Sequence, residues 1–158
     1  MKKYWPLIVV ILVSFLGGAA ITYQKKTMAM MPFMIHFMGL FFLFLSTFKF
    51  WDLPGFHEGF QMYDLLASRA KVYGYVYPFL ELIIAMGFLA HFLLPAVAIF
   101  TFILMAFSAL GVVKAVMAGL DIRCACMGTK LDLPLSTVSI VENLGMGIMS
   151  LFVLIWSF

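Results

Sequence analysis

Charge is scarce in this sequence. The 158 residues include 10 lysines and arginines and 7 aspartates and glutamates, so 11% of the chain is charged while 65% is hydrophobic. An ordinary soluble domain is about 25% charged, so water is not the main solvent of this chain. There is no phosphate-binding glycine loop, no sustained repeat, no low-complexity tract and no patch suited to nucleic acid. The net charge of +3 gives no indication of polyanion binding.

What the sequence does contain is long stretches without charge. An α-helix needs about 20 apolar residues to cross roughly 30 Å of hydrocarbon. Residues 4–24 and 27–48 carry no charge, and the long segment between Lys71 and Lys114 is broken by Pro95, where a helix is expected to end. The sequence predicts an all-α, polytopic membrane protein with one membrane domain over residues 1–158. Its five predicted transmembrane helices cover residues 5–23, 28–50, 75–92, 95–117 and 138–156.

The distribution of lysine and arginine predicts an orientation in the inner (cytoplasmic) membrane. With a cytoplasmic N-terminus, the positive-inside rule is obeyed, because only Lys25 and Lys26 then lie outside. The connections after the second and fourth predicted helices, residues 51–74 and 118–137, share one side in either orientation. The residues expected inside are Lys2, Lys3, Lys49, Arg69, Lys71, Lys114, Arg123 and Lys130.

The first of these connections is predicted to be an interfacial segment. Pro54 and Gly55 indicate a turn, and apolar residues then recur at helical spacing among charged ones. Such a pattern suits a helix lying at the membrane surface. The alternative is simple packing against the bundle. The apolar positions are Phe56, Phe60, Tyr63, Leu66 and Ala67.

The second connection holds both cysteines of the chain. Cys124 and Cys126 are two residues apart in a polar loop beside the membrane. Such a pair can form a small strained disulfide ring, exchange with a partner's disulfide, or bind a soft ion such as Cu(I), Hg(II) or Zn(II). The alternative is that both are small buried hydrophobic residues.

Four ionisable residues are expected at the same side of the membrane as the cysteines. Charged groups within a span are costly and usually face a partner or a wet cavity. Two ion pairs are predicted, one between Lys49 and Glu81 and one between Lys114 and Glu142. A functional alternative is that Glu81 or Glu142 exchanges protons with the thiols, with Asn143 orienting a carboxylate or closing a polar network.

Methionine is abundant, at 13 residues. Met30, Met34 and Met38 are spaced to form a thioether stripe along the second predicted helix. Thioethers bind Cu(I), so the stripe is a candidate entry path on the face opposite the cysteines. Flexible apolar packing is the alternative.

Several short motifs carry a resemblance to a known family. Lys49 with residues 52–56, residues 63–64 and residues 77–81 resembles the DoxX-like membrane proteins. Residues 124–128, 133–135 and 138–143 resemble the redox-associated MauE branch. The resemblance covers the chain from about residue 28 to the end. It implies a four-helix DoxX-like bundle to which the first helix is an addition.

The resemblance also implies a function. MauE proteins are associated with maturation of the disulfide-rich small subunit of methylamine dehydrogenase, alongside a thioredoxin-like protein. Carried over to this chain, Cys124 and Cys126 are the redox pair, and Lys49, Glu81 and Glu142 belong to the shared core. Related chains also lie near heavy-metal-associated domains, which keeps a metal role open.

Three hypotheses follow. The first is a membrane thiol-redox protein that exchanges reducing equivalents with a thioredoxin-like partner in the maturation of other proteins. The second is a soft-metal permease or metallochaperone that uses the methionine stripe and Cys124 and Cys126. The third is a non-catalytic membrane assembly subunit. The candidate cofactors are a soft metal ion and a quinone. The candidate partners also include a heavy-metal-associated domain protein and a second copy of the chain. A reducing cytosol disfavours a stable disulfide in this loop.

Overall fold

The computed structural model describes residues 5–24, 29–119 and 135–157, and these ranges are helical with short turns. The predicted all-α class is confirmed. The helices are α1 (Trp5–Gln24), α2 (Met30–Trp51), α3 (Leu53–Gln61), α4 (Lys71–Leu89), α5 (Leu94–Met117) and α6 (Leu135–Ser157).

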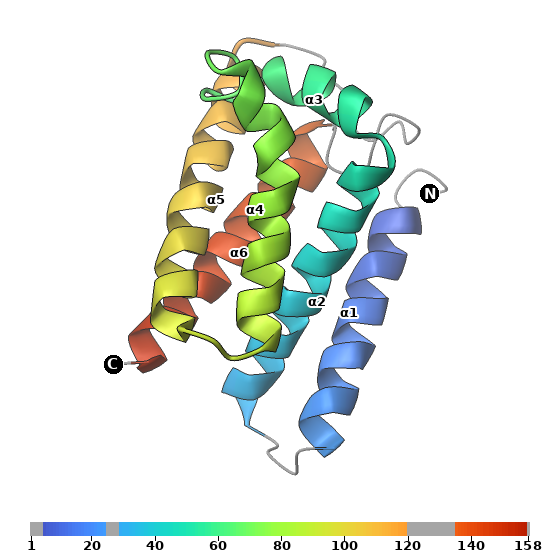
Figure 1. Ribbon diagram of the computed structural model, residues 1–158, viewed down its shortest axis with the longest axis vertical. Helices are drawn as coiled ribbons and strands as arrows, with labels where there is room; N and C mark the ends of the chain where they lie inside the picture. The colour runs from blue at the N-terminus through green and yellow to red at the C-terminus, as the bar shows by residue number, and fades with distance from the viewer. Residues whose placement is uncertain (1–4, 25–28, 120–134, 158) are drawn as a thin grey trace.

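The long helices α1, α2, α4, α5 and α6 lie side by side, and the short α3 crosses one end of the bundle (Figure 1). The chain runs alternately up and down, so α2 and α5 finish, and α4 and α6 begin, at the end where α3 lies. We call this the α3 end. The turns from α1 to α2 and from α4 to α5 lie at the opposite end, which we call the far end.

The long helices suit a lipid bilayer. Helices α1, α2, α4 and α5 are each long and apolar enough to cross a membrane, and α6 has a shorter apolar stretch, Glu142–Ser157. Large apolar side chains such as Leu16, Ile83 and Ile155 point outward and are more than 60% exposed. An exterior of this kind is stable against acyl chains, and the protein is a polytopic helical membrane protein.

The segment between α2 and α4 packs against the bundle. Helix α3 begins at a cap in which the backbone N–H of Gly55 donates to Asp52 Oδ1 over 3.2 Å, with a proline in the first turn. Phe56 and Phe60 of α3 are 1% exposed. Helix α4 then starts at Lys71, four residues before the predicted start at residue 75.

A carboxylate organises the turn that follows α3. Asp64 is buried and accepts hydrogen bonds from the backbone N–H groups of Leu66 and Ala67, both over 2.9 Å. Burial raises the pKa of the Asp64 carboxyl, and the two hydrogen bonds oppose that rise. The turn lies directly on α5, because a Cβ atom at Gly111 would come within 2.7 Å of the Tyr63 carbonyl oxygen.

Helix α1 is attached to the rest of the bundle through α2. Ser14 and Gly18 are buried on its inner face, and a Cβ atom at Gly18 would lie 3.2 Å from the Phe37 backbone nitrogen. Within the described ranges, α1 contacts α2 and no other helix. The helix therefore stands at the edge of the bundle, as Figure 1 shows.

Candidate functional site

A buried ion cluster lies near the α3 end. Lys49, in the last turn of α2, forms an ion pair with Glu81 of α4. The Lys49 Nζ also lies 3.7 Å from Oε1 of Glu142 on α6. The three side chains are at most 3% exposed. One cation thus joins two carboxyl groups from two other helices, and the predicted Lys49–Glu81 pair is present.

The predicted pair between Lys114 and Glu142 was wrong. Glu142 faces Lys49, and Lys114 is exposed. The reason is helical spacing: Lys114 lies on the same face of α5 as the exposed Leu110 and Met117, whereas Gly111 and Ala115 face the core. The sequence correctly indicated that Lys114 lies in the last turn of its helix, but it did not indicate which face of the helix carries the side chain.

Two aromatic rings also lie close to the Lys49 ammonium group. Its Nζ lies 5.4 Å from the centroid of Phe56 on α3 and 5.1 Å from that of Tyr77 on α4. Both distances are within the range in which a ring face attracts a cation. Helix α3 therefore covers the site at the α3 end, and its Phe56 helps to stabilise the charge of Lys49.

A small polar pocket adjoins the cluster. The Nδ2 of Asn143 donates to Ser108 Oγ over 3.3 Å, and Tyr77 and Ser108 share a hydrogen bond. A cavity of about 10 Å³ lies among these residues, Lys49 and Glu142. That volume is close to the roughly 10–15 Å³ that one water molecule needs. The predicted role of Asn143 in a polar network beside a carboxylate therefore has the required neighbours.

Charge balance gives the cluster its chemistry. Among the described residues, the Oε2 atoms of Glu81 and Glu142 are buried without a hydrogen-bond partner. An ionised carboxylate in such surroundings is costly. With one ammonium for two carboxyl groups, the cluster is neutral when one carboxyl carries a proton. A group of this composition can take up and release a proton without leaving an isolated buried charge.

The cysteines lie outside the described residues. Cys124 and Cys126 belong to the chain between the end of α5 at Met117 and the start of α6 at Leu135. Both of these helix termini lie at the α3 end, as Figure 1 shows.

The methionine stripe passes from the surface into the core along α2. Met30 is 79% exposed, Met34 is half-buried and Met38 is fully buried. Met30 and Met34 line a pocket of about 300 Å³ with Phe152 and Trp156 of α6 at the far end. The stripe therefore does not lie along one continuous surface.

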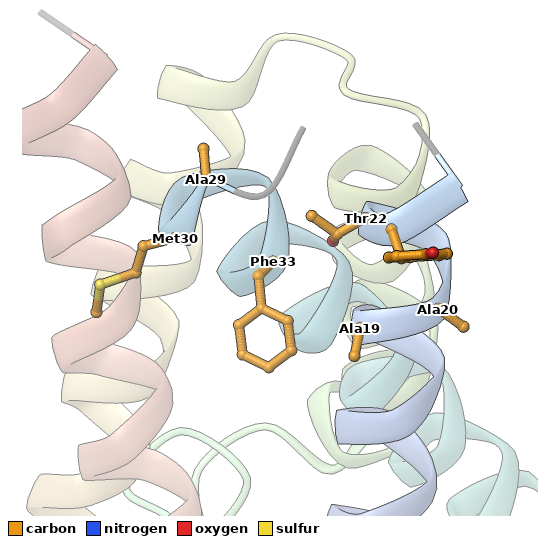
Figure 2. Close-up of a pocket in the computed structure, with 7 residues that line it drawn as sticks. Ala19, Ala20, Thr22, Ala29, Met30 and Phe33 are labelled. Atoms are coloured by element: carbon orange, nitrogen blue, oxygen red, sulfur yellow. The ribbon is translucent and has the colours of Figure 1, made fainter. Parts of the chain in front are cut away.

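A second far-end pocket lies between α1 and α2. Figure 2 shows Phe33 of α2 beside Ala19 and Thr22 of α1, while Met30 points toward α6. The volume of this open groove is about 620 Å³. Thr22 uses its hydroxyl within its own helix, because its Oγ1 donates to the Gly18 carbonyl over 2.7 Å. The groove is separated from the ion cluster by most of the length of the bundle.

Sequence reasoning missed the two rings and Ser108. Tyr77 precedes Glu81 by one helical turn on α4, and this spacing was a usable signal. Phe56 reaches Lys49 because α3 folds back over the bundle, which no local pattern specifies. Ser108 is an isolated hydroxyl in an apolar stretch and gave no signal of its own.

Comparison with known families assigns most of the chain to a family. The family described as methylamine utilisation protein MauE matches residues 27–157. No curated protein and no solved structure shows significant similarity to the chain. The matched range contains α2 to α6 and the two cysteines, and α1 lies outside it.

Proposed function

The chain belongs to the methylamine utilisation protein MauE family, and from that premise we propose that it is a membrane thiol-redox protein. Its Cys124 and Cys126 exchange reducing equivalents with a thioredoxin-like partner during the maturation of other proteins. The observation that carries the proposal is the buried cluster of Lys49, Glu81 and Glu142, because it supplies an exchangeable proton on the side from which the cysteine segment departs.

The exchange proceeds through a mixed disulfide. The thiolate of one cysteine attacks a sulfur of the partner's disulfide, and a bond forms between the two proteins while the partner's S–S bond breaks. The second cysteine then displaces the partner and closes the Cys124–Cys126 disulfide. Two electrons pass to the partner, and its two sulfurs take the two protons that the cysteines give up.

The ion cluster handles one of these protons. A thiol must lose its proton before it attacks, and a carboxylate near a membrane surface is a suitable acceptor. Glu142 is the better candidate, because Glu81 is held directly by Lys49 while Glu142 lies 3.7 Å from the same ammonium group. Glu81 and Lys49 stay paired, so the net charge of the cluster changes from −1 to zero when Glu142 takes the proton.

The direction of electron flow follows from the proposed orientation. The lysines and arginines in the described ranges lie at the α3 end, which favours a cytoplasmic position for this end by the positive-inside rule. The cytosol keeps thiols reduced. The resting form is therefore the dithiol, and the protein passes electrons to its partner.

A soft-metal function is the second candidate, favoured by the pocket that Met30 and Met34 line at the far end. Thioether sulfur binds Cu(I), and the cysteine pair would receive the ion at the opposite end. Within the described ranges, no group of three histidine, cysteine, aspartate or glutamate residues is placed to hold a metal. A non-catalytic assembly role is the outcome if neither activity is found.

Thiol exchange and metal transfer can be distinguished with the same set of variants. We expect Cys124→Ser and Cys126→Ser each to abolish exchange with a disulfide substrate in proteoliposomes, while Thr129→Ala in the same segment keeps it. Unchanged exchange in either serine variant rules out the redox proposal. A tight Cu(I) site under reducing conditions, lost on replacing both cysteines, would instead support metal transfer.

A further inference from the structure

An apolar cleft leads to the ion cluster from the side of the bundle. Its volume is about 190 Å³, and α1, α2 and α6 each contribute walls to it. Helices α1 and α6 both pack on α2, and within the described ranges they do not contact each other. The cleft therefore separates α1 from α6. Its lining residues are Leu7, Ile11, Phe37, Phe41, Glu142, Gly145, Met146 and Met149.

One buried carboxyl group faces this apolar lining. Among the described residues that line the cleft, Glu142 alone is ionisable. It is 3% exposed, and its Oε2 has no hydrogen-bond partner within the described ranges. Its Oε1 lies 3.7 Å from Lys49 Nζ. The cleft thus offers one strong polar contact among apolar walls, which is the pattern of a site that orients an apolar ligand.

The other walls suit a flat ring. Phe37 and Phe41 stand one turn apart on α2 with stacked rings, 5.9 Å between centroids and 20° between planes. Met146 and Met149 of α6 line the same cleft. Thioether side chains adapt their shape and make favourable contacts with aromatic rings. The volume is below the roughly 300–1,000 Å³ of a drug-sized ligand site, so one ring fits and a long tail remains outside.

We propose that this cleft binds the aromatic head of a membrane quinone–quinol couple, with its tail in the bilayer. Acyl chains and ester groups of phospholipids carry no hydrogen-bond donor for the Glu142 carboxylate. A quinol hydroxyl donates to that carboxylate, and a quinone carbonyl accepts from the protonated carboxyl. Both redox states of the couple therefore find a partner in Glu142.

The couple also matches the thiol chemistry, although this part rests on the proposed function. A dithiol that becomes a disulfide loses two electrons and two protons, and a quinone that becomes a quinol gains two of each. Oxidation of Cys124 and Cys126 by quinone thus balances: two S–H bonds break, one S–S bond forms, and two O–H bonds form. In the reverse reaction, quinol reduces the Cys124–Cys126 disulfide and regenerates the dithiol.

Binding is tested directly by photolabelling. The full chain in lipid nanodiscs is irradiated with an azido-substituted benzoquinone that carries a short isoprenoid tail, with and without excess unmodified quinone. We expect competable labelling of peptides from α1, α2 and α6. Gly145→Phe fills the cleft, since a Cβ atom at Gly145 has no neighbour within 4 Å. It should reduce labelling at least tenfold, whereas Ile148→Phe, on the exposed face of α6, should leave it unchanged.

Two further variants assign the contact and separate the proposals. Glu142→Gln keeps the shape of the side chain and should weaken labelling severalfold, with thermal stability measured to confirm folding. The double variant Cys124→Ser and Cys126→Ser should label like the wild type, so loss of thiol exchange does not affect this test. Equal labelling of Gly145→Phe and wild type overturns the site. Gly145-dependent labelling by a photoactivatable phospholipid, without competition by quinone, assigns the cleft to acyl chains and overturns it too.

Discussion

Replacing Lys49 by methionine removes the one cation of the buried cluster while keeping most of the side-chain volume. Glu81 and Glu142 would then be buried without an opposite charge among the described residues, since all three side chains are at most 3% exposed. Removing one partner of a buried ion pair lowers the free energy of unfolding by about 3–5 kcal/mol. The interactions of the ammonium group with Phe56 and Tyr77 are lost as well. We therefore expect Lys49→Met to lower the free energy of unfolding by about 3–5 kcal/mol.

A double-mutant cycle shows whether the loss comes from the pair itself. Lys49→Met combined with Glu81→Gln leaves Glu142 as the remaining carboxyl of the cluster, which becomes neutral by taking a proton. The double variant should recover part of the stability, with an interaction energy of about 1–3 kcal/mol between the two sites.

Denaturant or thermal unfolding in micelles measures these differences, followed by circular dichroism. Lys114→Met is the matched control, because Lys114 is exposed and its change should stay within about 0.5 kcal/mol. The reasoning is refuted if Lys49→Met is no more destabilising than Lys114→Met. It is also refuted if the effects of Lys49→Met and Glu81→Gln simply add.

Two further predictions concern packing and pH. Gly111→Ala should destabilise the protein by about 1–3 kcal/mol, because its Cβ would lie 2.7 Å from the Tyr63 carbonyl oxygen. Gly145→Ala, with open space around it, should instead gain up to about 1 kcal/mol of helix stability, and the same unfolding assay compares them. The raised pKa of Asp64 means that the folded protein holds this proton more tightly than the unfolded chain does. The free energy of unfolding should therefore fall as the pH rises above about 3.8 toward the folded-state pKa. Asp64→Asn should remove that fall, and an unchanged pH profile of stability would contradict the assignment.

Much of the fold could be predicted because lipid imposes a simple rule. Long charge-free stretches specify spans, and the alternation of spans specifies which connections share a side. The start of α4 differs from the prediction because Lys71 begins a helix outside the apolar stretch, where the packed turn around Asp64 leads directly into it. The ends of a charge-free stretch indicate where the chain enters the lipid, but a helix can begin before that point.

The site was predictable in part. Depth in the membrane brought Lys49, Glu81 and Glu142 to one end, and the structure joins them. Depth alone does not specify the face of a helix, so Lys114 was paired wrongly. The aromatic contacts of Lys49 depend on the path of α3 over the bundle, which is a long-range property of the fold.

The central claim, that the buried cluster handles a proton for the cysteine pair, is tested by the rate of thiol–disulfide exchange in proteoliposomes. Glu142→Gln is compared with Glu58→Gln, which removes an exposed carboxylate of α3. Loss of a general acid–base group typically costs about 10²–10⁴-fold in rate. We predict at least a tenfold lower rate for Glu142→Gln, with Glu58→Gln equal to wild type. Equal rates in all three proteins, in a preparation where Cys124→Ser abolishes exchange, would contradict the account.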